Sequence, residues 1–317
     1  MLRWHRIPQI AIIASTLIAS ACWDEDPGPT TGEHDAVAAD ATTGSEDSAP
    51  SDAPPTDDSP IGGDRPAQVI LPPGYAPGTP RPLLILLHGF SATGPLQDLY
   101  LGLTPAAAQK GFITIIPDGT VNELGFHYWN AAPAWCCNFT GADVDDSGYL
   151  LGLVDEASRR FSVDPERVYL FGHSNGGFMA HKMACEHADR FAAIAALAGS
   201  MPLAEKDCAP SAPVSVLQIH GTLDALVLYP GAVGLYPGSD DVMRRWAGHD
   251  GCDSRPDAGG RFDFDAAALG DETEVLSFTG CEGASLALWK MHGSSHVPLF
   301  TASFIPAMLD WLLAQAR

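Results

Sequence analysis

The chain has 317 residues, of which 46% are hydrophobic and 18% are charged, and it carries a formal net charge of −22 at pH 7. This length suits one α/β domain of about 250 residues with an additional segment. The strong acidity argues against nucleic acid or an anionic lipid surface as the partner.

The N-terminal segment has the pattern of an export signal. Two arginines precede an apolar stretch from Ile10 to Ile18, which is too short for a stable membrane span. The stretch ends in Ala-Ser-Ala-Cys, which resembles a bacterial lipobox with Ala at the position where Leu is commonest. We therefore expect residues 1–22 to be a lipoprotein signal peptide and Cys22 to be lipid-modified after cleavage. Ordinary cleavage just before Cys22 is the alternative.

Residues 23–64 contain twelve acidic residues, six prolines and no lysine or arginine. Such a segment buries too little apolar surface to fold, so we expect an extended, self-repelling spacer. Residues 65–317 are then the folded domain. We expect an exported protein, either a cell-envelope lipoprotein or an extracellular one, that touches a membrane only through its N-terminal lipid.

Apolar runs bounded by Gly and Pro recur along the domain, and their continuous apolarity is typical of strands buried on both faces of a parallel sheet. The runs are residues 82–89, 111–119, 167–174, 191–200, 213–221 and 284–293. Helix-like segments follow at 104–110, 147–161, 175–188, 239–248 and 301–315. This alternation predicts an α/β fold with a mostly parallel, doubly wound sheet and helices on both faces. Ligands bind such sheets beyond the carboxyl ends of the strands.

The third of these runs ends in Gly-His-Ser-Asn-Gly, with Gly172, Ser174 and Gly176 alternating. This pattern is typical of a nucleophile elbow, in which a strand turns sharply into a helix and presents a serine at the turn. Only residues without large side chains fit two places before and after the serine. An exposed serine in a glycine-rich turn is the alternative, but the strand and helix predicted on either side favour the elbow.

Two downstream residues complete a candidate triad with Ser174. A serine hydroxyl needs a neighbouring base, and that base needs an orienting acid. In α/β-hydrolases the acid and then the histidine follow the serine along the chain. Asp224 lies just beyond one strand, and His296 lies in the loop after the last strand. We therefore predict Ser174, Asp224 and His296 as the catalytic residues.

Other residues are weaker candidates for these roles. Asp240 and Asp241 resemble helix-start residues, and His292 ends a strand directly instead of lying in the flexible loop. The remaining histidines have structural interpretations. We expect His88 and His220 to be buried at strand ends, His173 to neighbour the elbow, and His181 and His187 to lie on a helix surface.

A tetrahedral oxyanion needs two preorganised backbone N–H groups. We expect one from Asn175, at the start of the helix after Ser174, and the other from Phe90, in the loop after the first apolar strand. The sequence contains no cluster of Asp, Glu and His that requires a metal and no glycine-rich phosphate loop. We therefore expect no cofactor.

Six cysteines lie in the domain, and an even number in an exported protein suggests disulfides. A zinc site is the competing interpretation, but the spacing does not match paired Cys-x-x-Cys motifs. We predict that Cys252 pairs with Cys281, because the Gly- and Asp-rich segment between them needs tethering. The other four residues leave the pairing open: Cys136, Cys137, Cys185 and Cys208.

The motifs together resemble the polyhydroxybutyrate depolymerase-like esterases, which include the feruloyl and acetylxylan esterases of carbohydrate esterase family 1. The resemblance runs from about Pro66 to the C-terminus. It rests on "RVYLFGHSNGGFMAHKMACEHADRFAAIAALAG" with "LLHG" before it and "IHGTLDALVLY" after it, on the paired Cys136-Cys137 and on "VDDSGYL". The family's Gly-Gly-Gly-His-Trp-Pro reads Gly-Ser-Ser-His-Val-Pro here, so His296 carries over but the tryptophan is absent.

This resemblance implies an α/β-hydrolase fold and serine-esterase activity without a metal or organic cofactor. The family pattern also leads us to expect Cys185 and Cys208 near each other. A peptidase of the same fold and a non-catalytic binding lipoprotein on a hydrolase scaffold are the alternative functions.

The aromatic segment 126–139 is expected to overhang the site. Trp129, Trp135 and Phe139 are candidates for contact with an acyl group, and local packing beside disulfides is the alternative for each. The chain shows no separate module for adsorption to a solid. We therefore expect a monomer acting on small or oligomeric soluble esters, such as acylated sugars, feruloyl or acetyl esters of polysaccharides, or short hydroxyalkanoate oligomers.

Overall fold

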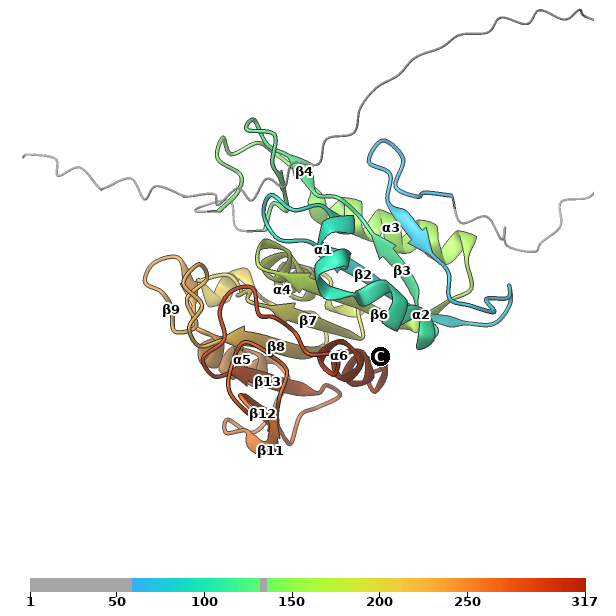
Figure 1. The fold of residues 1–317 in the computed structure, drawn as a ribbon. Coiled ribbons are helices and arrows are strands. Elements are labelled where there is room, and N and C mark those ends of the chain that lie inside the picture. The colour runs from blue at the N-terminus through green and yellow to red at the C-terminus, as the bar shows by residue number, and fades with distance from the viewer. Residues whose placement is uncertain (1–58, 132–135) are drawn as a thin grey trace, which may run out of the picture. The chain divides into compact units, whose positions relative to one another are not determined.

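A nine-stranded sheet forms the centre of the structure (Figure 1). The computed structural model describes residues 59–131 and 136–317. The expected signal peptide with Cys22, the spacer up to residue 58, and Trp135 lie outside the described residues. In spatial order the strands are β1 (Gln68–Ile70), β3 (Ile113–Ile116), β2 (Arg81–Leu87), β6 (Val163–His173), β7 (Ala193–Leu197), β8 (Ser215–Gly221), β13 (Leu286–Met291), β12 (Thr273–Phe278) and β11 (Asp257–Phe262).

The six central strands, from β3 across to β13, pair in parallel. The outer pairings β1–β3, β13–β12 and β12–β11 are antiparallel. Each central strand coincides with one of the six apolar runs of the sequence, so the predicted mostly parallel, doubly wound sheet is confirmed. The carboxyl ends of these strands therefore meet at one edge, where the candidate residues fall.

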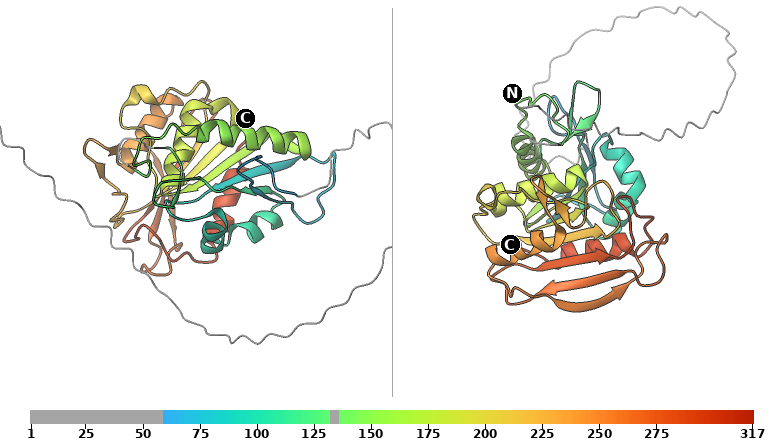
Figure 2. Two further views of the ribbon diagram at one scale, coloured as in Figure 1. Left: turned by 90° about the horizontal axis from the view of Figure 1, so that it is seen from above. Right: turned by 90° about the vertical axis from the view of Figure 1, so that its left-hand side faces the viewer.

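Helices cover both faces because side chains along each buried strand alternate between two apolar clusters. Leu83 and Ile85 of β2 join the cluster with α3, α4 and α5, whereas Leu84 and Leu86 join the one with α1, α2 and α6. Figure 2 shows α3 (green) on one side of the sheet and α2 (teal) and α6 (red) on the other. The helices are α1 (Gly94–Leu101), α2 (Leu103–Gln109), α3 (Asp146–Arg160), α4 (Asn175–Glu186), α5 (Ser239–His249) and α6 (Phe304–Leu313).

Shorter elements lie in the connections between strands and helices. They are the strand pairs β4 (Thr120–Val121) with β5 (His127–Tyr128) and β9 (Gly231–Ala232) with β10 (Tyr236–Pro237), and the 3₁₀ turns Ala188–Arg190 and Glu205–Asp207. Within the two described ranges, no helix is both long enough and apolar enough to cross a membrane.

The segment between Cys252 and Cys281 contains the hairpin β11–β12, which extends the sheet at one edge. Its sequence predicts only a Gly- and Asp-rich stretch in need of a tether. Every residue of β11 is exposed, so the strand shows no apolar face from which it can be recognised. The helix α1 was also not expected; Thr93 caps it by accepting from the N–H of Leu96.

The folded domain begins earlier than the expected boundary at residue 65. Ile61 is buried in the core and pairs as a β-bridge with Ala67. Ser59 accepts a hydrogen bond from Arg160 of α3 through its hydroxyl. Residues 59–64 are therefore part of the domain, because Ile61, the one apolar side chain in this polar stretch, is buried in the core.

Three disulfides join the six cysteines of the domain. Cys252 pairs with Cys281, and Cys185 at the end of α4 pairs with Cys208. Of the pairings left open by the spacing, the structure contains the one in which the adjacent Cys136 and Cys137 bond to each other. The first two bridges join segments far apart in sequence, whereas the third constrains only its own peptide unit.

Candidate active site

Ser174 stands at a sharp turn between β6 and α4, with φ 55° and ψ −120°. Positive φ is strained for a residue with a side chain and persists only where the surroundings hold it. Two close approaches make glycine necessary on either side. A Cβ on Gly172 would lie 2.1 Å from the carbonyl oxygen of Gly176, and a Cβ on Gly176 would lie 2.1 Å from that of Leu87. The spacing in the Gly-x-Ser-x-Gly motif thus follows from backbone crowding.

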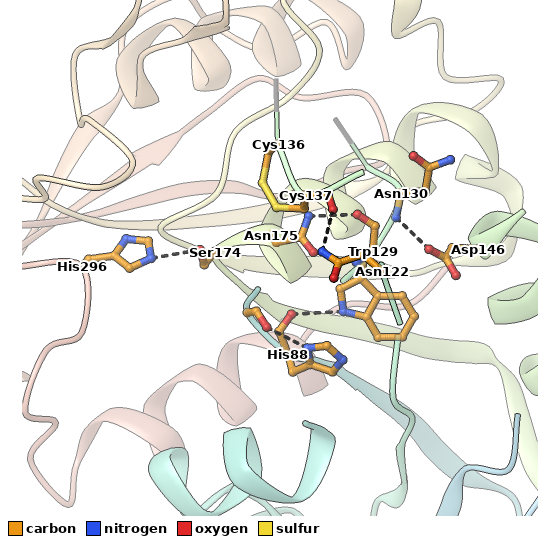
Figure 3. The surroundings of a disulfide bond; sticks show 11 residues. His88, Asn122, Trp129, Asn130, Cys136, Cys137, Asp146, Ser174, Asn175 and His296 are labelled. Carbon is orange, nitrogen blue, oxygen red and sulfur yellow. Dashed lines mark hydrogen bonds between the residues drawn. A yellow bond between two sulfur atoms is a disulfide. The ribbon is translucent and has the colours of Figure 1, made fainter. Parts of the chain in front are cut away.

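Ser174, His296 and Asp224 form one hydrogen-bonded line. The His296 Nε2 lies 2.9 Å from the Ser174 Oγ, and its Nδ1 lies 2.7 Å from the Asp224 Oδ2. Since a carboxylate only accepts, Nδ1 carries the proton and Nε2 is free to accept from the serine hydroxyl. Figure 3 shows the imidazole facing Ser174.

The loops that carry Asp224 and His296 are bound to each other by a backbone–side-chain and a backbone–backbone hydrogen bond. The Gly293 N–H donates to the Thr222 Oγ1 at 2.9 Å, and the Leu223 N–H donates to the Ser294 carbonyl at 3.0 Å. The acid and the base, 72 residues apart in sequence, are therefore positioned as one unit.

Asp224 is buried and surrounded by donors. Its Oδ1 accepts from the N–H groups of Leu226 and Val227 at 2.8 and 2.9 Å, and its Oδ2 accepts from His296 and, at 3.2 Å, from His220. Burial acts to raise the pKa of Asp224, but the hydrogen bonds from the two histidines outweigh it and hold the pKa well below its usual range. Asp224 is thus ionised, and its Oδ1 also closes its own turn through the N–H groups of Leu226 and Val227.

The other candidates for acid and base point elsewhere. The His292 Nε2 lies 2.9 Å from a carboxylate oxygen of Glu274, and its side chain is 40% exposed. Asp240 accepts from the Tyr229 hydroxyl, and Asp241 pairs with Arg244 on the surface. None of the three touches Ser174.

The expected oxyanion donors lie on either side of Ser174. A Cβ on Gly89 would lie 3.4 Å from that of Ser174, which places the loop carrying Phe90 against the turn. The Gly89 N–H is held by the Gln97 Oε1 at 3.1 Å. Asn175 begins α4, where the backbone N–H has no partner within its own helix. A reacting carbonyl at Ser174 would therefore find backbone donors from two segments.

Trp129, expected to contact substrate, is fully buried. Its Nε1–H donates to the His88 carbonyl at 3.1 Å, and both of its backbone polar groups bond to the side chain of Asn175 (Figure 3). The indole cannot reach a ligand, because its polar edge and both faces are used in packing. Its role is structural, and sequence alone does not distinguish it from an exposed aromatic residue.

Phe139 is 55% exposed, and its ring packs edge-on against Phe90 with centroids 5.8 Å apart. Phe126 also packs edge-on against Phe90, with centroids 5.7 Å apart, and is 43% exposed. We refer to Phe90, Phe126 and Phe139 as the aromatic edge. It includes Phe90 of the loop after β2, whereas Trp135 is outside the described residues.

Several histidines are buried around the site. Burial lowers the pKa of His88, His173 and His181 to about 4 in each case, so all three are neutral near pH 7. The His173 Nε2 donates to the carbonyl of His296 at 3.0 Å and so supports the loop of the base. The expectation that His181 lies on a helix surface is wrong, since it faces the sheet and is fully buried. The residues around His181 on α4 form no clear apolar face from which its burial could be predicted.

Metal ligands are not grouped in the described ranges, where no three His, Cys, Asp or Glu side chains are placed to bind an ion. The groups that the structure brings together at Ser174 are a hydroxyl, an imidazole and a buried carboxylate. These groups suit nucleophilic attack on a carbonyl carbon.

The chain is similar to known esterases in sequence and in fold. A family model described as "Putative esterase" matches residues 59–206. The putative esterase NocK of Nocardia uniformis is 33% identical over 161 residues, which are 49% of this chain and 45% of NocK. Feruloyl esterase B of Piromyces equi is 29% identical over 59% of this chain and 36% of its own length. Feruloyl esterase D of Neurospora crassa is 28% identical over 73% of both chains. The chain thus spans less than half the length of the first two relatives.

Solved structures share the fold. The acetyl xylan esterase from Aspergillus awamori superposes with a TM-score of 0.56 at 18% identity, over 82% of this chain and 97% of that one. The Bacillus cereus carboxylesterase gives a TM-score of 0.51 at 15% identity, over 80% and 95%. At these identities the match establishes the α/β-hydrolase fold.

Proposed function

Since the chain is an esterase-like α/β-hydrolase, we propose that it hydrolyses carboxylic esters through an acyl-enzyme, with Ser174 as nucleophile, His296 as general base and Asp224 as orienting acid. The observation that carries the proposal is the line of hydrogen bonds from the strained Ser174 through His296 to the buried Asp224. A serine that only closed a turn would need neither partner.

In the first step the Ser174 Oγ attacks the ester carbonyl carbon while the His296 Nε2 takes the hydroxyl proton. The ionised Asp224 stabilises the resulting imidazolium and keeps the remaining proton on Nδ1. The carbonyl oxygen becomes an oxyanion, which accepts from the backbone N–H groups of Phe90 and Asn175.

Collapse of this intermediate breaks the bond to the alcohol oxygen, which leaves with the proton from His296. The acyl group then remains on Ser174. A water molecule gives a proton to His296 and attacks the acyl carbon, and the second collapse releases the carboxylic acid and restores the serine.

We extend the proposal to acylated sugars, feruloyl or acetyl esters and short hydroxyalkanoate oligomers as the substrate class. Two observations support it. Relatives of this chain are named feruloyl and acetylxylan esterases. The aromatic edge offers partly exposed rings beside the oxyanion loop, where an acyl or alcohol group can stack.

We also propose that the protein is exported and anchored through a lipid on Cys22. Three disulfides support export, because such bonds persist in oxidising compartments. Membrane fractionation of the full chain and of Cys22→Ser tests the anchor. Release of the variant into the soluble fraction supports it, and a soluble wild type contradicts it.

The activity is tested with short-chain nitrophenyl esters, a peptide panel and a fluorophosphonate probe on residues 59–317. Ester turnover and labelling of Ser174 are expected. Turnover of peptides without esters indicates a peptidase, and no turnover with no labelling indicates a binding protein. Initial rates on methyl ferulate, acetylated xylan, hydroxybutyrate trimer and amorphous polymer film then define the substrate.

A further inference from the structure

A chain of buried polar side chains leads from α5 to the carboxylate of Asp224. Trp246, His181, Gln218, Ser239 and His220 all lie at 2% exposure or less. They come from α5, α4 and β8, so this series of side chains lies just below the carboxyl end of the sheet. The proposed mechanism uses none of them.

The direction of the first hydrogen bonds follows from Trp246, whose indole nitrogen can only donate. It lies 3.2 Å from the His181 Nδ1, which must therefore accept. Because burial lowers the pKa of His181 to about 4, the ring is neutral and carries its one proton on Nε2. That proton is donated to the Gln218 Oε1 at 2.8 Å.

The side-chain amide of Gln218 continues the same direction of hydrogen-bond donation. With Oε1 accepting, its Nε2 donates to the Gly199 carbonyl at 2.9 Å and to the Ser239 Oγ at 3.3 Å. The Ser239 Oγ lies 2.6 Å from the His220 Nδ1 and can donate its hydroxyl proton to it. When the His220 Nδ1 accepts, the ring carries its one proton on Nε2.

Two acceptors face that proton. The Val227 carbonyl lies 2.8 Å from the His220 Nε2, and the Asp224 Oδ2 lies 3.2 Å from it. The same Oδ2 accepts from the Nδ1 of His296. One carboxylate oxygen therefore receives an N–H from the base on one side and an N–H from His220 on the other.

We propose that His220 is a positioning residue for the triad, held as the neutral Nε2–H tautomer by Ser239 and Gln218 so that it donates to Asp224 without adding a positive charge. The inference rests on the proposed esterase function of the same site. A second donor fixes the direction in which Oδ2 meets His296 and takes up part of its negative charge. A cationic His220 would instead neutralise the carboxylate and weaken its hold on His296.

Other charged groups surround this pair and remain unchanged in the test below. The groups that face His220 are Asp224 and Tyr229 of the following loop, Lys290 at the paired position of β13, and His173 of β6. Asp240 of α5 approaches His220 through its hydrogen bond with Tyr229. The groups that face His296 are Ser174, Asp224 and His173. A shift caused by a substitution at His220 therefore reports on the hydrogen bond that is lost.

Two substitutions of similar polarity separate the roles of the two ring nitrogens. His220→Asn keeps an amide near Ser239 but is too short to donate to Asp224, whereas His220→Gln keeps a donor of similar reach to Nε2. His292→Asn is the matched control, since His292 also bonds a carboxylate at a strand end but does not touch the triad. Rates on a nitrophenyl ester are expressed per site labelled by fluorophosphonate, so that unfolded protein does not count.

In His220→Asn we expect kcat to fall roughly tenfold or more with KM nearly unchanged. The acid limb of the pH profile should move upward by about half a unit or more, because the less compensated Asp224 favours the imidazolium of His296. His220→Gln should restore most of kcat and most of the position of the acid limb. His292→Asn should change neither of these two quantities. An unshifted profile in His220→Asn, or a shift shared by His292→Asn, overturns the proposal.

Nitrogen and proton NMR of the wild-type histidines tests the inference without turnover or a variant. We expect the His220 ring to carry a proton on Nε2 and none on Nδ1. A cationic ring or an Nδ1–H tautomer overturns the proposal. If the wild type hydrolyses no ester, the proposed function fails, while the NMR result still decides the tautomer of His220 and its coupling to His296.

Discussion

The side chain of Asn175 pairs with both backbone polar groups of Trp129: its Oδ1 accepts from the Trp129 N–H at 2.7 Å, and its Nδ2 donates to the Trp129 carbonyl at 2.9 Å. Asn175, which follows Ser174, thus holds the segment leading toward the aromatic edge. One side chain therefore links the start of α4 to the segment that carries Trp129.

Replacing Asn175 by alanine keeps its backbone N–H but leaves two buried groups of Trp129 without partners, which costs about 1–3 kcal/mol. We expect a lower melting temperature and a fall in kcat/KM of roughly tenfold or more. Asn138→Ala is the control, since Asn138 ties Ala142 and Asn130 instead of the nucleophile turn. Thermal melting and rates per labelled site measure the two effects. Equal activity of the two variants would contradict the link.

Ser174→Ala and His296→Ala should each reduce turnover by on the order of a thousandfold or more, and Asp224→Asn should also be severe. The reason is that the three side chains act as one unit, so removing any member stops proton transfer from the serine. His292→Ala should stay near the wild type, because His292 bonds Glu274. Steady-state rates on a nitrophenyl ester decide. A damaging His292→Ala with a mild His296→Ala would reverse the assignment of the base.

Asp250 is buried at the end of α5, and in the described part of the chain neither carboxylate oxygen has a partner in hydrogen-bonding geometry. Burial raises the pKa of Asp250 from 3.8 to about 7, and the backbone of Val214 offsets this only in part. Between these values the folded state binds the proton more tightly than the unfolded state. This group therefore makes the free energy of unfolding decrease as pH rises from about 4 to about 7.

Asp250→Asn should raise the free energy of unfolding at pH 8 by a few kcal/mol and change it little at pH 4. The comparison must be between variant and wild type, because the buried histidines act in the opposite direction: with pKa values lowered to about 4, they favour folding as pH rises toward 6.5. Urea titrations at both pH values provide the measurement. An equal effect at both would show that folding does not raise the pKa of Asp250.

Removing the Cys252–Cys281 bridge with Cys252→Ser/Cys281→Ser should lower stability by about 3 kcal/mol, since it closes a loop of 29 residues. Activity per folded molecule should persist, because three strands of the sheet, β7, β8 and β13, separate this hairpin from β6, which Ser174 follows. The matched variant Cys136→Ser/Cys137→Ser opens no loop and should cost much less stability. Chemical denaturation of both variants tests this. A larger loss of unfolding free energy in Cys136→Ser/Cys137→Ser would show that the adjacent pair stabilises more of the structure than its own peptide unit.

Phe139→Ala should weaken hydrolysis of methyl ferulate more than that of an acetyl ester. The exposed ring packs on Phe90 and adds stacking surface that only an aromatic acyl group uses, worth roughly 0.5–1.5 kcal/mol. The ratio of kcat/KM for the two esters should fall about two- to tenfold. Leu269→Ala, at a fully exposed position near the sheet edge, is the control. An unchanged ratio would remove Phe139 from the substrate contact.

The central strands and most helices were predictable because burial on both faces imposes continuous apolar runs and amphipathic segments. The elbow was predictable for a related reason: backbone crowding at 2.1 Å leaves room only for glycine at two fixed positions around Ser174. Where a strand is not buried, as in the fully exposed β11, the sequence shows no apolar pattern that predicts it. A single apolar residue such as Ile61 likewise does not reveal that the domain begins before residue 65.

Sequence alone determined the order of Ser174, Asp224 and His296 along the chain and their places beyond strand ends, since parallel strands bring their carboxyl ends to one edge. Only the tertiary structure decided which polar groups meet there. It placed His292 against Glu274, buried Trp129 against Asn175, and brought His220 and His296 to the same oxygen of Asp224. Hydrogen bonds of this kind depend on angles and distances between segments up to 72 residues apart, and neither composition nor spacing encodes them one by one.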